Sequence, residues 1–274
     1  MELRVTAMYF SATGTTEKVC RTVAERIAAG LSAAAPDVYD FTLPEKRRQA
    51  PEFGENDVVV FGTPVYAGRV PNVLLDYVKS VRFRGSIAVP VVLFGNRDFD
   101  DALLELSETL SDGGAVIAGA GAFVGEHAFS TVLAKGRPDE EDLGKAGELA
   151  AVVAERIRNA GGAAGVEEPE IPGEDPIRPY YRPRDSKGNF IDIRKVTPVT
   201  GSSCDGCGLC ADVCPMGSID PDDVTKLTGI CIKCCACVKK CPRGAKYFDD
   251  KGFLYHKEEL EKMYERRADS RIFV

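Results

Sequence analysis

The stretch "LRVTAMYFSATGTTEKVCRTVAERIAAG", residues 3–30, reads as a strand, a loop and a helix. Residues 3–10 form the predicted strand. In the helix, Val19, Val23 and Ile27 recur at helical spacing before the terminating Gly30. A strand, a loop and a helix in this order are typical of the start of a doubly wound α/β sheet. The stretch therefore predicts a parallel sheet that is covered by helices.

The same alternation continues along the next 130 residues. Strands are expected at 37–42, from Asp57, from Ile87 and within 114–124, and helices at about 71–81, 98–111 and 139–159. Near-continuous apolar runs at 58–61 and 89–94 suit strands that are buried on both faces. The sequence thus predicts a five-stranded, three-layer α/β domain over residues 1–165.

The loop between the first strand and the first helix is "SATGTT", residues 11–16. Hydroxyls and backbone amides that point into the start of a helix favour an anion, because the unpaired N–H groups and the helix dipole both attract negative charge. The loop lacks the P-loop pattern and the dinucleotide fingerprint, since Gly14 is its only glycine. It predicts either a phosphate site or a simple helix cap.

Two further loops favour the phosphate site. "GTPVYAGRVPN" (62–72) follows the third predicted strand, and "GNRDFDDAL" (95–103) follows the fourth. Both loops are therefore expected at the carboxyl edge of the sheet, beside the loop at 11–16. Doubly wound folds bind their ligands at that edge.

With these three loops, residues 1–160 resemble the flavodoxins, and the strand order expected is 2-1-3-4-5. The resemblance implies FMN, with its phosphate held by Ser11, Thr13, Gly14, Thr15 and Thr16. It also implies that the isoalloxazine is bordered by Pro64, Val65, Tyr66, Ala67, Gly68, Asn96, Arg97 and Phe99. Tyr66 either gives the flavin an aromatic face or covers the edge of the core.

The loop after the fifth predicted strand, "GEHAFS" (125–130), contains Glu126 and His127. A histidine close to a flavin has a pKa suited to donating a proton, so His127 is the candidate catalytic residue. The alternative is a loop histidine that makes a structural hydrogen bond.

Two runs near the other end of the chain repeat the pattern Cys-x2-Cys-x2-Cys-x3-Cys-Pro. They are "CDGCGLCADVCP" (204–215) and "CIKCCACVKKCP" (231–242). In the bacterial ferredoxin spacing, three cysteines of a run hold one 4Fe-4S cluster and the fourth ligates the other cluster. The first cluster is accordingly assigned to Cys204, Cys207, Cys210 and Cys241, and the second to Cys231, Cys234, Cys237 and Cys214.

Structural zinc is the competing interpretation of the cysteines, because two Cys-x2-Cys pairs make a tetrahedral site. Zinc does not account for the third cysteine of each triplet or for the trailing Cys-Pro. Residues 200–250 resemble the two-cluster bacterial ferredoxins, which predicts a small α+β domain. Cys235 and Cys20 fall outside the pattern and are expected to be non-ligating.

The length and charge of the chain limit its possible domain division and partners. A chain of 274 residues exceeds the usual single domain, which predicts 1–165 as the FMN domain, 166–200 as an extended Pro-rich connector, and 201–274 as the cluster domain with a tail. Lys and Arg total 35 against 42 for Asp and Glu, which argues against nucleic acid as a partner. No export signal or membrane-spanning run is visible, so we expect a cytoplasmic protein with reduced thiols and no membrane attachment.

The arrangement as a whole resembles the flavodoxin–ferredoxin fusion proteins of anaerobic bacteria and archaea, or EFR-type ferredoxins. The resemblance implies an iron-sulfur flavoprotein that transfers electrons between FMN and two 4Fe-4S clusters and on to redox partner proteins. The alternative function is a ferredoxin-fed, FMN-dependent reductase acting on a small organic substrate near Tyr66, Arg97 and His127.

Overall fold

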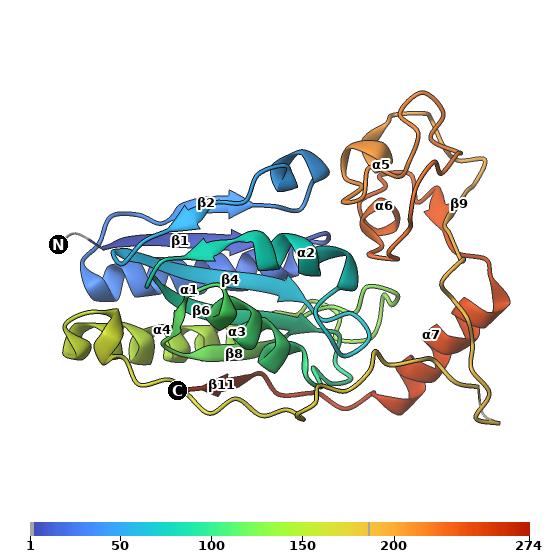
Figure 1. Cartoon of the computed structure of the whole chain (residues 1–274). Coiled ribbons are helices and arrows are strands. Elements are labelled where there is room, and N and C mark those ends of the chain that lie inside the picture. The colour runs from blue at the N-terminus through green and yellow to red at the C-terminus, as the bar shows by residue number, and fades with distance from the viewer. Residues whose placement is uncertain (1–2, 186) are drawn as a thin grey trace.

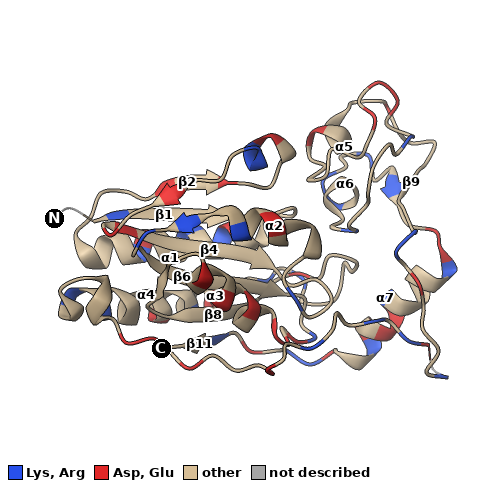
Figure 2. Cartoon of the chain, in the orientation of Figure 1, with Lys and Arg blue, Asp and Glu red and all other residues tan. Residues whose placement is uncertain are grey.

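The computed structural model describes residues 3–185 and 187–274. Met1 and Glu2 of the predicted first domain, and Ser186 of the predicted connector, lie outside the described residues. A large α/β domain is followed by an extended connector and a small cysteine-rich unit, which we define as residues 199–247 (Figure 1). Figure 2 shows basic and acidic residues interspersed along the chain instead of gathered on one face.

The central sheet contains seven strands within the described part of the chain. Five of them are parallel and lie in the order β2 (Asp37–Asp40), β1 (Arg4–Tyr9), β4 (Asp57–Pro64), β6 (Ile87–Phe94) and β8 (Ala120–Val124). This order confirms the predicted flavodoxin-like sheet. The short β7 (Val116–Ile117) is parallel to β6, and β11 (Arg271–Phe273) pairs antiparallel with β8.

Two helical layers cover the sheet. One face packs against α1 (Thr15–Leu31) and α4 (Glu140–Ala160), and the other against α2 (Asn72–Ser80) and α3 (Ala102–Asp112). Val19, Val23 and Ile27 are fully buried on α1, as their helical spacing predicts. Of the helices in residues 3–185 and 187–274, none is long and apolar enough to cross a bilayer.

The other elements are short apart from one helix. They are η1 (Pro44–Arg47), β3 (Glu52–Phe53), β5 (Arg82–Phe83), η2 (Ala163–Gly165), β9 (Val199–Thr200), α5 (Leu209–Asp212), α6 (Ala236–Lys239), β10 (Lys246–Tyr247) and α7 (Lys251–Met263). The sequence predicts a short helix over 257–263, whereas α7 begins six residues earlier. Its start is set by Asp250, whose carboxylate accepts a hydrogen bond from the Phe253 N–H at 2.8 Å.

The connector is attached to the α/β domain at the start of α3. The Asp101 side chain is fully buried, and its carboxylate accepts hydrogen bonds from the Arg178 N–H at 2.8 Å and from the Arg178 Nη2 at 2.5 Å. The Arg178 side chain lowers the pKa of Asp101 to about 2. A buried carboxylate that accepts several hydrogen bonds fixes its donors, so this end of the connector is held to the sheet domain.

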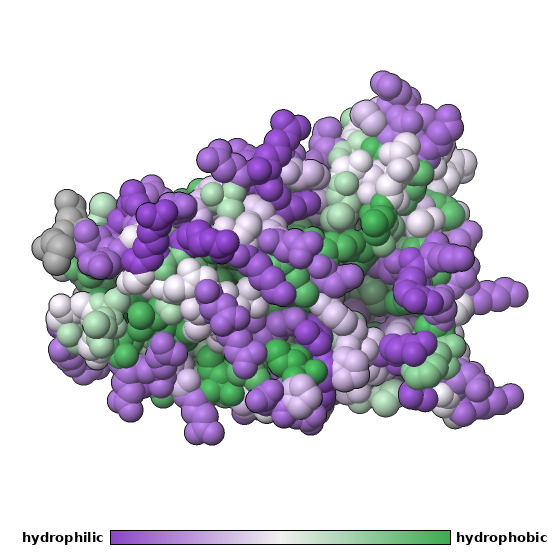
Figure 3. Space-filling view, in the orientation of Figure 1, coloured by the Kyte–Doolittle hydropathy of each residue, from purple (hydrophilic) through white to green (hydrophobic). Residues whose placement is uncertain are grey.

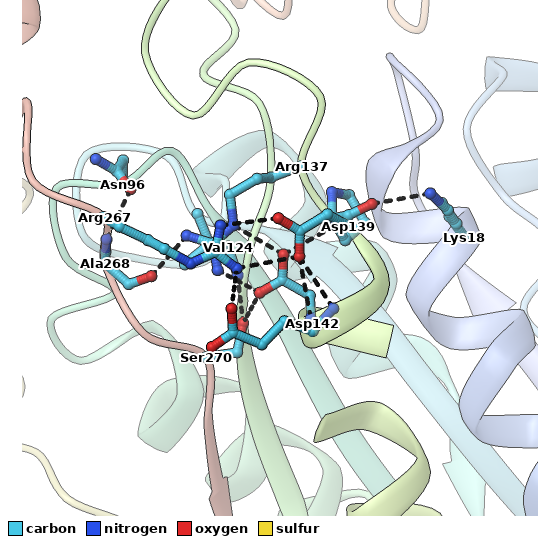
Figure 4. Close-up of polar contacts among 11 residues, drawn as sticks. Lys18, Asn96, Val124, Arg137, Asp139, Asp142, Arg267, Ala268 and Ser270 are labelled. Carbon is cyan, nitrogen blue, oxygen red and sulfur yellow. Dashed lines mark hydrogen bonds and ion pairs between the residues drawn. The ribbon is translucent and has the colours of Figure 1, made fainter. Parts of the chain in front are cut away.

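The chain returns to the α/β domain after α7. Ser270 donates its hydroxyl to Asp142 Oδ1 at 2.6 Å and accepts a hydrogen bond from the Val124 N–H at 3.1 Å. Arg137 pairs with Asp142 and donates to the Ala268 carbonyl at 2.6 Å (Figure 4). The tail that was predicted together with the cluster domain therefore packs against the sheet through β11.

We expect Ser270→Ala to lower the free energy of unfolding of the full chain by about 1.5 kcal/mol, because the buried Asp142 carboxylate loses a hydroxyl donor. Chemical denaturation measures the change. Ser111→Ala, at a half-buried position near the end of α3, is the control and should change stability by less than about 0.5 kcal/mol. Equal stabilities for the two variants would contradict the anchoring role of Ser270.

Candidate functional site

A cavity of about 550 Å³ lies at the carboxyl edge of the sheet, and we call it the edge cavity. The α/β domain, the connector, α7 and the cysteine-rich unit all contribute to its wall. Figure 3 shows apolar surface at the junction between the cysteine-rich unit and the α/β domain. Of the predicted flavin-binding residues, those that line the cavity are Thr13, Thr15, Thr16, Pro64, Val65, Tyr66, Ala67, Gly68 and Arg97.

The loop before α1 is shaped by Ser11 and Gly14, the two predicted residues of this loop that do not line the cavity. The Ser11 hydroxyl accepts a hydrogen bond from the Glu17 N–H at 3.0 Å. Gly14 precedes the helix with φ 92°, a conformation that costs residues with a Cβ about 1–2 kcal/mol. The loop thereby turns the threonines and the start of α1 toward the cavity, an arrangement that fits a phosphate group.

The loop after β4 makes a tight turn against the loop after β6. The backbones of Tyr66 and Arg69 exchange hydrogen bonds of 2.9 and 3.2 Å, with Ala67 and Gly68 at positive φ between them. A Cβ at Gly68 would lie 2.2 Å from Asp100 Oδ2, so the close approach of the two loops requires glycine there. The turn presents the half-buried Tyr66 ring to the cavity.

Tyr66 also lies close to cysteines of the second run. Burial raises the pKa of its phenol well above 10, and negative charge on the sulfur atoms of Cys234 and Cys231 adds to the rise. An aromatic ring that lines the cavity beside these thiols is placed to contact a planar ligand on one side. Tyr66 also packs against the hydrophobic core, so the same ring covers the edge of the core and lines the cavity.

Two other predicted flavin contacts are not brought to the cavity. The Asn96 amide donates to the Tyr264 and Arg266 carbonyls, each at 2.7 Å, and so binds the C-terminal segment. Phe99 is 4% exposed and packs against Phe94 at a ring-centroid distance of 5.6 Å. Both side chains therefore lie outside the cavity lining, because Asn96 binds the C-terminal segment and Phe99 packs against Phe94.

His127 lines the edge cavity with its imidazole packed over Gly95, where a Cβ would lie 2.4 Å from Cδ2. Its Nδ1 accepts a hydrogen bond from the Phe129 N–H at 3.1 Å. Burial, and then the Lys239 ammonium, lower the pKa of His127 to about 4. The ring is therefore neutral at neutral pH, and the structural hydrogen bond that the sequence left open is present.

The connector and α7 complete the cavity wall, which the sequence did not predict. The Tyr181 N–H donates to the Ala67 carbonyl at 2.8 Å, and the Tyr181 ring lies under the Arg97 guanidinium, 4.7 Å from ring centroid to Cζ. The Tyr181 ring also stacks against His256 of α7, with ring centroids 6.2 Å apart. Paired aromatic residues in the connector predict packing along a domain, but not which domain, and nothing in the sequence marks His256.

Two smaller cavities lie in and beside the cysteine-rich unit, and each is lined by four thiols of the predicted crossed sets. Cys204, Cys207, Cys210 and Cys241 line one cavity, and we call them the outer set. Cys231, Cys234, Cys237 and Cys214 line the other, and we call them the inner set. All ten cysteines lie in the described part of the chain and are free thiols.

The two sets share a local geometry. In the inner set, Cys214 Sγ accepts a hydrogen bond from the Ser218 N–H at 3.3 Å, and in the outer set Cys241 Sγ accepts one from the Ala245 N–H at 3.3 Å. Backbone N–H groups that point at sulfur stabilise thiolate ligands. Four thiols around one cavity with such donors fit a 4Fe-4S cluster. Within residues 3–185 and 187–274, no three His, Cys, Asp or Glu residues form a group that could hold a single metal ion.

Burial distinguishes the sets. Cys234 is 8% exposed, whereas Cys207 of the outer set is an exposed residue. Cys235 also lines the inner cavity, but its thiol donates to the Lys233 carbonyl at 3.5 Å. Burial raises the pKa of the Cys235 thiol, so it stays protonated at neutral pH.

Comparison with known proteins supports both halves of the chain. Residues 7–89 match a flavodoxin domain model, and residues 198–220 match a 4Fe-4S binding domain model. No curated protein matches. These matches support FMN and at least one 4Fe-4S cluster as cofactors.

Three solved structures illustrate the range of similar chains. Rubredoxin oxygen:oxidoreductase from the anaerobe Desulfovibrio gigas is 18% identical with a TM-score of 0.40, and the match covers 57% of this chain and 36% of that one. A flavodoxin from Streptococcus pneumoniae TIGR4 is 18% identical with a TM-score of 0.40, covering 57% and 100%. A flavodoxin from the domain Archaea is 18% identical with a TM-score of 0.36, covering 58% and 99%. With the two family matches, the chain combines a flavodoxin domain at its amino end with a 4Fe-4S binding motif in its cysteine-rich unit.

Proposed function

We propose that the protein is an iron-sulfur flavoprotein of the flavodoxin–ferredoxin fusion type. It carries electrons between FMN in the edge cavity and two 4Fe-4S clusters, and on to redox partner proteins. FMN, when bound, exchanges two electrons, and each cluster exchanges one. The chain's part is to bind these groups, to hold them at a fixed separation and to exclude water from the space between them.

The observation that carries the proposal is the position of Cys234. This cysteine lines both the edge cavity and the inner thiol cavity, and its neighbour Ile232 does the same. A ligand of the inner cluster would therefore form part of the wall of the flavin site, with no other segment of the chain between them. Electrons can then pass between the two sites directly.

The binding roles follow from the residues around the edge cavity. Thr13, Thr15 and Thr16, with the first N–H groups of α1, would hold the phosphate. The turn that contains Tyr66, with Arg97 opposite, would border the isoalloxazine. Ser11 and Gly14 act through the shape of the loop.

The thiols would ligate in the crossed sets, with the inner cluster beside the flavin and the outer cluster beyond it. The outer set includes the exposed Cys207, so the outer cluster is the one from which a partner protein can collect or deliver electrons. This order gives a route from a covered flavin to the protein surface. The charges next to Cys207 are balanced, because Arg243 pairs with Asp205 at 2.7 Å.

The carrier function is favoured over reduction of an organic substrate by the state of His127. A reductase needs a positioned acid, and a histidine with a pKa of about 4 is already deprotonated at neutral pH. Its Nδ1 is also occupied by the Phe129 N–H. The residue is better suited to holding the loop than to delivering a proton.

Reductive titration of anaerobically purified protein tests the proposal. We expect about eight iron, eight sulfide and one FMN per chain, and uptake of about four electrons, two by FMN and one by each cluster. When the flavin alone is reduced by a light flash, electron paramagnetic resonance should detect reduced cluster before any external acceptor is added. Stoichiometric zinc without iron, or a flavin that never exchanges electrons with a cluster, would contradict the proposal.

His127→Ala serves as the control that separates carrier from reductase. In a carrier it should retain FMN and reduce a small one-electron acceptor at the wild-type rate. An organic acceptor whose reduction slowed by ~100-fold in this variant, with cluster reduction intact, would favour the reductase instead.

A further inference from the structure

Lys239 occupies a particular position in the cysteine-rich unit. It is the last residue of α6 and lies two residues from Cys237 of the inner set and two from Cys241 of the outer set. Its side chain is only 17% exposed although it is charged. A buried ammonium in a segment that supplies ligands to both sets needs partners to remain charged.

Those partners all lie on one loop of the α/β domain. The Lys239 ammonium pairs with the Glu126 carboxylate, and it donates to the carbonyls of His127 at 2.9 Å and Ser130 at 3.1 Å. An ammonium has three donors, so these acceptors satisfy it completely. Residues 125–129 of this loop line the edge cavity.

No other ion pair joins the cysteine-rich unit to the α/β domain in the part of the chain that the structure describes. A second polar link, from Arg47 Nη2 to the Pro215 carbonyl at 2.5 Å, involves η1 and not the cavity. Lys239 is thus distinguished by what it connects. It joins the segment between the two thiol sets to the loop that forms one wall of the flavin site.

We infer that Lys239 is the positioning residue for flavin–cluster electron transfer, holding the inner thiol set against the cavity loop by its three hydrogen bonds. The inference rests on the proposed function. It assigns the residue no contact with flavin or iron, because its donors are all engaged by the loop. Without these three hydrogen bonds, the loop and α6 would be free to separate. A change of about 1 Å in the positions of reacting groups can lower a rate by ~100-fold.

The test compares Lys239→Met with Lys240→Met in full-length, cofactor-loaded protein. Lys240 follows Lys239 directly and is exposed, so its replacement removes the same charge without breaking these contacts. We expect both variants to keep wild-type iron and FMN. Lys239→Met alone should slow flash-initiated electron exchange between flavin and cluster by about tenfold or more. Hydrogen–deuterium exchange should rise at residues 125–130 in Lys239→Met only, a readout that does not depend on electron transfer.

Lys239→Arg tests whether the charge of Lys239 or the arrangement of its donors is responsible for the effect. A planar guanidinium keeps the charge but presents its donors in a fixed fork, so it should restore part of the rate and part of the protection. If Lys239→Met loses iron, Glu126→Gln is tested in its place, because that substitution leaves both cysteine runs intact. Glu126→Gln should show the same slower electron exchange and the same loss of protection from hydrogen–deuterium exchange.

The possible outcomes are distinguishable. Wild-type exchange rates and wild-type protection in Lys239→Met, or in Glu126→Gln where that variant is needed, overturn the inference. Equal slowing by Lys240→Met also overturns it, because the effect would then belong to charge alone. Absence of flavin–cluster exchange in the unmodified protein would instead contradict the proposed function.

Discussion

Replacing Cys214 with alanine should lower the iron content from about eight to about four atoms per chain, and the cluster lost should be the inner one. The reason is geometric, since Cys214 belongs to the first cysteine run but lines the cavity of Cys231, Cys234 and Cys237. A 4Fe-4S cluster needs four protein ligands. Iron and sulfide analysis under anaerobic conditions gives the content, and flash-initiated electron exchange identifies which cluster remains.

Cys241→Ala and Cys235→Ala complete this experiment. Cys241→Ala should also halve the iron, but it should leave flavin–cluster exchange intact, because Cys241 lines the outer cavity. Cys235→Ala is the matched control, as a buried neighbouring thiol that donates to a carbonyl, and it should keep about eight iron. If Cys214→Ala kept flavin–cluster exchange while Cys241→Ala abolished it, the crossed assignment would be wrong.

The second large effect is expected in FMN binding. Thr15→Val should weaken FMN binding to the full chain by about 10- to 100-fold, because a hydrogen bond to a charged phosphate contributes about 1.5–3 kcal/mol. Thr15 lines the edge cavity, and its side chain packs against Gly125, so the isosteric valine should keep the loop in place. Fluorescence titration of flavin-free protein with FMN measures the dissociation constant.

Thr22→Val is the control for this substitution. Thr22 lies on α1, and its hydroxyl donates to the Lys18 carbonyl at 2.8 Å, away from the cavity lining. FMN affinity should therefore stay within about twofold of the wild-type value. Tighter binding of FAD than of FMN would contradict the assignment of a single-phosphate site, whatever the result for Thr15→Val.

The sheet domain could be predicted from the sequence because each of its elements carries its own periodic signal. Val19, Val23 and Ile27 mark α1, and the apolar runs at 58–61 and 89–94 mark β4 and β6, all within short windows. β11 gives no such signal, since it has only three residues. Its pairing depends on β8, about 150 positions earlier in the chain.

Part of the candidate site could also be predicted from the sequence. Loops at the carboxyl edge follow from strand order, which is why the predicted threonines and the Tyr66 turn lie around one cavity. The cysteines of each predicted set likewise line one cavity. Asn96 lies in the expected loop, but its amide is engaged by residues about 170 positions later in the chain. Long-range packing of this kind leaves no periodic trace in a single sequence.

The return of the chain to β11 makes the α/β domain discontinuous, with the cysteine-rich unit inserted between its fourth helix and its last strand. An inserted unit with two attachment points, at Arg178 and at Ser270, has less rotational freedom than one on a single flexible tether. A cut after residue 165 would leave β8 as an open edge, a surface that promotes aggregation. The two halves should therefore resist separation into independently working modules.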